Sequence, residues 1–243
     1  MYYNHEEYQI RRSQRARRAR IVVTADKIEV VVPLRMPEKQ IRQFMQAKQT
    51  WITSAKSKVQ QHVDNTASFA PESYQQGAMI PYQGKQYKLQ VEASQEKQIK
   101  ISFEQSFIAY VPENLHKTLT HTELSEQIQK ALVVWMGQAA AKRAVNTVDH
   151  YSPLYRLKPR SIIIKTQKSR WGSCGIHDDI NLNWLLILAP VEVFEYVVVH
   201  ELCHIAQRNH SAAFWSLVAR HCPDYKQQRL WLKQHGASLM LGL

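Results

Sequence analysis

The strongest chemical signal in the chain is the pentapeptide HELCH at residues 200–204. Side chains four positions apart on a helix lie one above the other, so His200 and His204 can direct ring nitrogens at a single metal ion. Glu201 is turned away from that axis, where its carboxylate reaches a metal-bound water instead of the metal. A random chain of this composition contains the HExxH pattern about 0.03 times, so chance is a poor explanation for it.

A third histidine, His210, follows the motif after a short polar turn. Asparagine tolerates left-handed backbone, so Asn209 can end the helix and direct His210 back toward the site. Catalytic zinc sites use three protein ligands and leave the fourth position for water. The sequence therefore predicts one Zn²⁺ per chain, held by His200, His204 and His210, with Glu201 as general base and acid.

The helix that carries this motif is predicted to be largely buried. Pro190 suits its first turn. Apolar residues flank the motif at Val197, Val198, Val199, Leu202, Cys203, Ile205 and Ala206. Burying two histidines and a glutamate among them is costly unless they bind something, which favours a metal site over hydrogen-bonded core histidines.

The remaining patterns predict an α+β chain of two parts. Residues 1–115 are expected to form a basic, β-rich module with a hairpin over 21–33 that turns at 25–27, one helix over 37–63, and further strands between 79 and 112. Residues 116–243 are expected to form the metal-dependent hydrolase domain. Its predicted elements are a long helix from 123, strands at 161–165 and 179–184 joined by a loop, the motif helix, a helix after Ser211 and a last helix over 224–234.

The charge of the chain is concentrated near its start. The formal net charge is +12, and residues 1–60 hold thirteen Lys or Arg against five Asp or Glu. The densest run contains Arg11, Arg12, Arg15, Arg17, Arg18 and Arg20. Such a run attracts polyanions, namely nucleic acid, nucleotide phosphates or an acidic protein face, although a solvated basic strand or arm explains it equally simply.

Composition indicates the cellular compartment of the protein. No segment approaches the roughly 20 apolar residues that cross a bilayer, so no membrane contact is expected. The first ten residues lack the apolar stretch of a secretory signal. Three cysteines, Cys174, Cys203 and Cys222, are too few for a disulfide framework. These features predict a cytoplasmic protein.

Several segments together resemble the YgjP-like metallopeptidases, small zincins related to the SprT-like and WLM proteases. They are SRWGSC (169–174), INLNW (180–184), YVVVHELCH (196–204), NHSAAFW (209–215) and PDY (223–225), with KQTWI (48–52), PYQGKQYKL (81–89) and the Arg-rich start further upstream. The resemblance implies a minimal zincin fold, with a small sheet packed on the helix of the metal site. It also implies zinc held by the three histidines and a peptide or protein substrate.

The resemblance suggests where substrate contacts lie. SRWGSC leads into a strand near the site, so Arg170 is a candidate to bind a substrate carbonyl, carboxylate or phosphate, or to bond loop carbonyls instead. Asn181 and Asn183 alternate with Leu182 and are expected to face the cleft. The three-histidine spacing also suits the metzincins, but Gln207 stands where that group has its turn glycine.

Three functions follow from these observations. The first is a zinc metallopeptidase with Glu201 as general base. The second is a nucleotide pyrophosphatase at the same metal site, since some family members are linked to UTP pyrophosphatase activity; the chain lacks a Gly-rich phosphate loop in its support. The third is a basic adaptor with structural zinc that binds nucleic acid or acidic partners, against which the three-ligand set counts.

Overall fold

The computed structural model describes residues 2–5, 8–24, 27–64, 67–167 and 169–243. The chain divides into two compact units, residues 1–67 and 68–243. This division differs from the boundary between residues 115 and 116 predicted from the sequence. The physical reason is that the strands between residues 79 and 112 share one hydrophobic core with the C-terminal half of the chain.

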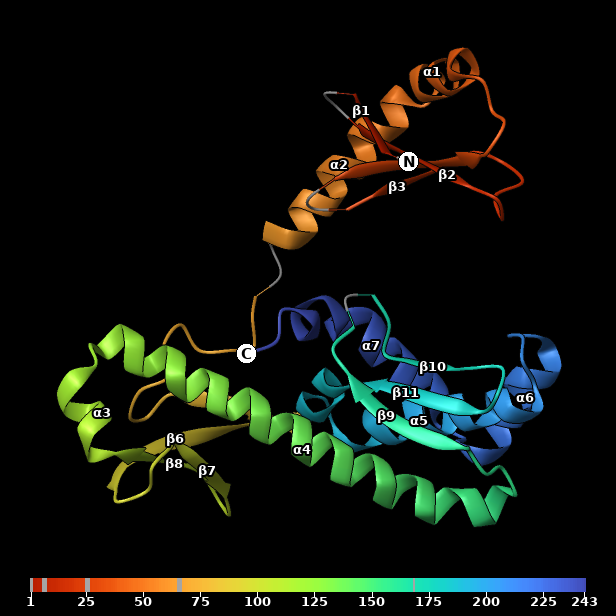
Figure 1. The fold of residues 1–243 in the computed structure, drawn as a ribbon. Coiled ribbons are helices and arrows are strands. Elements are labelled where there is room, and N and C mark those ends of the chain that lie inside the picture. The colour runs from red at the N-terminus through yellow and green to blue at the C-terminus, as the bar shows by residue number, and fades with distance from the viewer. Residues whose placement is uncertain (1, 6–7, 25–26, 65–66, 168) are drawn as a thin grey trace. The chain divides into compact units, whose positions relative to one another are not determined.

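The first unit is a four-stranded sheet packed against two helices (Figure 1). The strand order is β1 (Tyr2–His5), β2 (Tyr8–Ser13), β4 (Ile28–Pro33), β3 (Arg20–Val23), with β2 and β4 parallel and the other pairs antiparallel. The predicted hairpin is the pair of β3 and β4, although its turn at residues 25 and 26 lies outside the described residues. The helix predicted over 37–63 is divided at Lys48 into α1 (Glu38–Ala47) and α2 (Gln49–Asp64).

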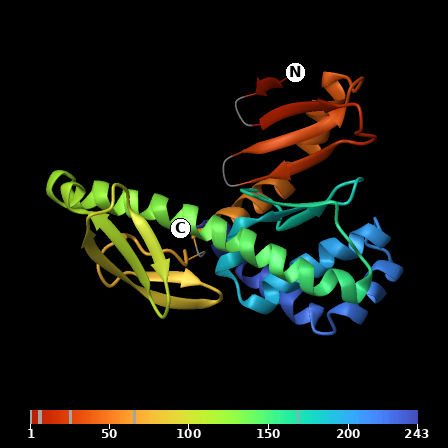
Figure 2. The ribbon, with the colours of Figure 1, turned by 60° about the horizontal axis from the view of Figure 1, so that its bottom comes forward.

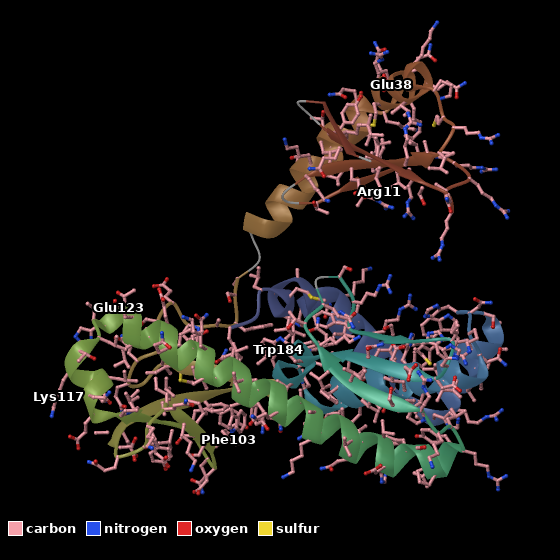
Figure 3. All side chains as sticks on the ribbon, viewed as in Figure 1. Arg11, Glu38, Phe103, Lys117, Glu123 and Trp184 are labelled. Atoms are coloured by element: carbon pink, nitrogen blue, oxygen red, sulfur yellow. The ribbon has the colours of Figure 1, made fainter. Side chains whose placement is uncertain are left out.

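The arginine run lies on β2, β3 and the turn between them. Arg11, labelled in Figure 3, pairs with Glu29 at 3.2 Å. Arg12 donates to the backbone carbonyls of Leu34 and Met36 at 2.9 and 2.7 Å. These two arginines therefore stabilise the unit itself, whereas four others are exposed: Arg15, Arg17, Arg18 and Arg20.

The second unit begins with another four-stranded sheet. Its order is β5 (Met79–Tyr82), β6 (Lys85–Ser94), β8 (Phe107–Pro112), β7 (Lys100–Phe103), and β6 and β8 are parallel. Alternate residues of β8, Phe107, Ala109 and Val111, are fully buried. Phe103, labelled in Figure 3, packs against Phe107 and against Trp135 from the following long helix.

A short helix, α3 (Glu113–Thr118), precedes the 35-residue helix α4 (His121–Tyr155), which joins this sheet to the C-terminal elements of the unit. Thr120 and Glu123 cap α4 reciprocally. Its buried positions, Ile128, Leu132, Met136, Ala140 and Ala144, recur every four residues and form one apolar stripe. Figures 1 and 2 both show α4 extending from the sheet of β5–β8 to the C-terminal elements of the same unit, and its apolar stripe shares one buried cluster with that sheet.

The second sheet of this unit is three-stranded, in the order β10 (Gly172–Cys174), β11 (Asp179–Asn183), β9 (Ser161–Lys165). β10 is antiparallel to β11, and β9 is parallel to it. The sequence predicted a loop where β10 lies, because three residues that include a glycine carry no strand pattern. Pairing with β11 creates this strand, which forms an edge of the sheet and packs on the HELCH helix.

The remaining elements are a 3₁₀ helix, η1 (Trp184–Leu188), and three α-helices, α5 (Val191–Ala206), α6 (Ala212–His221) and α7 (Tyr225–Met240). The hydroxyl of Ser211 caps α6, as predicted, and α7 continues six residues beyond its predicted end at 234. The α+β prediction is confirmed, with the small sheet packed on the HELCH helix. Among the described helices, none has the length and apolar character needed to cross a membrane.

Candidate metal centre

Helix α5 presents both histidines of the motif on one face. Ten of its sixteen residues are buried, including Glu201 and His204. The rings of His200 and His204 lie one turn apart with centroids separated by 5.0 Å. Packing of the valine-rich face of α5 against the core therefore fixes the direction in which the two imidazoles point.

His210 completes a cluster of three imidazoles. Helix α5 ends at Gln207, whose backbone is extended. His210 lies directly before Ser211, the N-cap residue of α6. The Nε2 atoms of His200 and His210 are 3.1 Å apart, and the ligand atoms of the three histidines all lie within 4.8 Å of one another. The three predicted ligands are thus brought together.

His200 and His204 use their Nδ1 atoms for contacts within the protein, which leaves their Nε2 atoms to bind a metal. His204 donates from Nδ1 to the carbonyl of Gln207 at 3.0 Å. His200 Nδ1 lies 3.5 Å from the Tyr196 hydroxyl, one turn earlier on α5. Outer contacts of this kind fix the tautomer of a metal-binding histidine.

The spacing of the nitrogens fits a tetrahedral ion. Zn–N bonds of about 2.0–2.1 Å at a tetrahedral angle separate two ligand nitrogens by about 3.3 Å. The 3.1 Å between the Nε2 atoms of His200 and His210 is close to that value. When no metal is bound, the same spacing lets one imidazole donate an N–H hydrogen bond to the other.

Burial keeps His200 and His204 in the form that binds metal. Burial, followed by the neighbouring His204 and His210, lowers the pKa of His200 to about 3. Burial is also the main reason why the pKa of His204 is lowered. A neutral imidazole is the ligand form, so His200 and His204 require no deprotonation at neutral pH.

Glu201 lies buried beside the cluster, with 5% of its surface exposed. Burial raises its pKa to about 8. Its Oε2 accepts no hydrogen bond from any residue that the structure describes. A buried carboxylate without a partner is costly, so this geometry favours an occupant that supplies either a proton or a positive charge.

Gly172 on β10 makes room for Glu201. A Cβ at Gly172 would lie 2.6 Å from Oε1, 2.7 Å from Cγ and 2.9 Å from Cδ of Glu201. These distances are all shorter than a normal contact, so no residue with a side chain fits there while Glu201 keeps its place. The Glu201 carboxylate therefore projects from α5 and lies against Gly172 of the edge strand β10.

The cluster opens into a cavity of about 610 Å³. β10 and the segment before it form one part of its lining, α5 and the turn after it form another, and α7 forms the rest. The lining residues are Arg170, Trp171, Gly172, Ser173, Cys174, Tyr196, Val197, His200, Glu201, His204, Arg208, His210, Arg229, Leu232 and Lys233.

The predicted substrate contacts divide into one residue in the cavity and two outside it. Arg170 lines the cavity, whereas Asn181 and Asn183 do not. Asn183 is fully buried, donates to the carbonyls of Gln167 and Arg170, and accepts from the amide of Leu185 at the start of η1. The expectation that Asn183 faces the cleft is therefore wrong, because its amide holds the loop before β10.

Asn181 lies on the same strand, paired with Ser173 on β10 and Ile163 on β9. Its Oδ1 is buried and has no partner among the described residues. Since it lies outside the cavity lining, the expectation that it faces the cleft is corrected as well.

The cysteines are free thiols, as expected. Cys203 is buried, and burial raises its pKa to about 12. Cys174 lines the cavity, but burial raises its pKa too, so a reactive thiolate is disfavoured.

Sequence reasoning missed several residues of the site. Tyr196 precedes His200 by one helical turn, and this spacing could have indicated their contact. Gly172, Arg229 and Lys233 reach the site only through long-range packing, which no local pattern reveals.

A sheet edge packed on a buried HExxH helix, with a third histidine after the helix, defines a zincin-like domain. The model of the family "YgjP-like, metallopeptidase domain" matches residues 17–235, and the chain belongs to this family. No curated protein matches the chain. The family is one of metallopeptidases, which supports a metal-dependent hydrolase, and the three histidines are a group able to hold its divalent metal.

Proposed function

We propose that the protein is a zinc metallopeptidase in which Glu201 acts as general base and then as general acid. The observation that carries this proposal is the convergence of three imidazoles beside a buried carboxylate that lacks a described partner. Three ligands leave a position for water, which argues against a purely structural ion.

The residues of the chain have distinct tasks in this mechanism. A divalent metal held by the Nε2 atoms would lower the pKa of a bound water and polarise the scissile carbonyl. Glu201 accepts the proton of the attacking water at its carboxylate, which a bound cation nearby would keep ionised despite its burial. Glu201 then delivers the proton to the leaving amine.

The edge strand β10 favours a peptide as substrate. Gly172, Ser173 and Cys174 line the cavity, and only one side of β10 pairs with another described strand. An extended peptide can pair with such an edge through its backbone, which places a peptide bond beside Glu201.

The test combines metal analysis with hydrolysis. We expect about one zinc per chain in the wild type and in Glu201→Gln, and its loss in His210→Ala. The control His116→Ala removes an exposed histidine of α3 and should retain the metal. Peptide hydrolysis by the wild type that disappears in Glu201→Gln supports the proposal, and full activity of that variant refutes it.

A nucleotide pyrophosphatase is the second candidate, and the positive lining of the cavity favours it. Arg170, Arg208, Arg229 and Lys233 all reach the cavity. Release of pyrophosphate from UTP by the wild type, without cleavage of any peptide, would establish this activity in place of the first. It too should disappear in Glu201→Gln.

We further propose that the four exposed arginines of the arginine run, Arg15, Arg17, Arg18 and Arg20, contact a polyanion. Arg17 and Arg18 are exposed in the turn before β3. Replacing both by glutamine should weaken binding of a fluorescent single-stranded DNA and flatten its salt dependence. The matched control replaces Lys39 and Arg42, two exposed cations of α1; equal losses in both double variants would contradict this contact.

A further inference from the structure

Helix α7 directs two positive side chains into the cavity of the histidine cluster. Arg229, Leu232 and Lys233 line the cavity at positions i, i+3 and i+4, which form one face of a helix. Like charges four positions apart on a helix repel each other and destabilise it. This arrangement therefore opposes helix stability unless the two charges share an anion.

The structure provides no acidic partner for this pair. Among the described residues that line the cavity, Glu201 is the only acid, and it is buried and forms no ion pair with Arg229 or Lys233. Arg208 is neutralised by Asp178. No described carboxylate forms an ion pair with Arg229, Lys233 or Arg170.

Arg229 is held close to the metal ligands by stacked aromatic rings. Its guanidinium lies over the ring of Trp215, 4.7 Å from the centroid, and Trp215 stacks on Tyr225. The Trp215 ring lies 5.8 and 5.7 Å from the rings of His200 and His210. A guanidinium stacked on an aromatic face keeps its N–H groups free for a planar oxyanion.

We propose that Arg229 and Lys233, with Arg170 from the segment before β10, form a subsite for an oxyanionic group of the substrate. This inference deepens the proposed function and rests on it. The group is a carboxylate or a phosphate: in a peptide it is the free C-terminal carboxylate near the scissile bond, and in a nucleotide it is a phosphate. The enzyme would then select short peptides that end near the cavity, or nucleotides, over internal segments of long chains.

The test measures binding instead of turnover. Zinc-loaded full-length Glu201→Gln is titrated with inorganic phosphate, with tetra-alanine bearing a free carboxylate, and with tetra-alanine amide, with calorimetry as the readout. The same titrations are repeated with Arg229→Gln or Lys233→Gln added. The matched control is Lys226→Gln, which removes one exposed charge of α7 outside the cavity lining.

We expect phosphate, the free peptide or both to bind about 10- to 100-fold more weakly to each of the two cavity variants, as for loss of a charge-assisted hydrogen bond. Lys226→Gln should stay within about twofold of its parent, and Arg229→Lys should recover only part of the affinity, because it keeps the charge but loses the stacked planar guanidinium. Preference for phosphate identifies a phosphate subsite, whereas preference for the free peptide over its amide identifies a carboxylate subsite.

Equal affinities in Arg229→Gln, Lys233→Gln and Lys226→Gln overturn the proposal, as does failure of both oxyanionic probes to bind. Zinc content measured for every variant separates loss of the subsite from loss of the metal. Because Glu201→Gln does not turn over, the subsite can fail while the wild type still hydrolyses peptides, and it can be confirmed even if no hydrolysis is found.

Discussion

The buried carboxylate of Glu201 makes the stability of the metal-free protein depend on pH. Burial raises the pKa of Glu201 from 4.5 to about 8, so the folded state holds this proton more tightly than the unfolded chain does. The resulting stabilisation is complete below pH 4.5 and is lost as the pH rises through about 8. Replacing Glu201 by glutamine removes the titrating group while preserving its size.

The magnitude follows from the two pKa values. One pKa unit corresponds to 1.36 kcal/mol. With a pKa of 4.5 in the unfolded chain and about 8 in the folded one, the free energy of unfolding of the wild type should fall by about 3 to 4 kcal/mol relative to Glu201→Gln between pH 5 and pH 8. The lowered pKa of His200 makes stability fall on the acid side, but it is present in both proteins and cancels in the comparison.

Urea unfolding in the presence of a chelator, at pH 5 and pH 8, measures this difference. Glu192→Gln, which removes an exposed carboxylate from the first turn of the same helix, serves as control and should not change the pH dependence. Saturating zinc should abolish the difference between wild type and Glu201→Gln at pH 8, because a nearby cation stabilises the ionised carboxylate. If the two proteins differ by the same free energy at pH 5 and pH 8, Glu201 does not have a raised pKa and the argument fails.

Three other predictions concern single side chains. Gly172→Ala should reduce hydrolysis on the order of 100-fold with the metal retained. The reason is that a Cβ placed 2.6 Å from Glu201 Oε1 must displace the carboxylate by about 0.8 Å. The control Gly175→Ala, whose Cβ would meet no atom nearer than 3.6 Å, should keep full activity. Gly137→Ala on α4 should raise the free energy of unfolding by about 0.5–1 kcal/mol, because its Cβ meets nothing within 4 Å; a lower melting temperature would contradict this. Asn183→Ala should lower the free energy of unfolding by about 2–4 kcal/mol through the loss of buried hydrogen bonds, without loss of zinc, and an unchanged urea midpoint would show that these bonds contribute little.

Local geometry made the metal centre predictable. The placement of His200 and His204 on one face depends only on the helical repeat, and the Ser211 cap depends on a hydroxyl and an amide three residues apart. The α+β class followed in the same way, because hydrophobic periodicity records which face of each element is buried.

Long-range packing decided the rest. The position of Gly172 against Glu201, the use of Asn183 to hold a loop and the approach of Arg229 to the histidines each join segments that lie far apart in the sequence. The same holds for the boundary at residue 67, which depends on α4 sharing its apolar stripe between two sheets. A sequence pattern shows that a side chain is buried or polar, but only the assembled core determines which neighbour it meets.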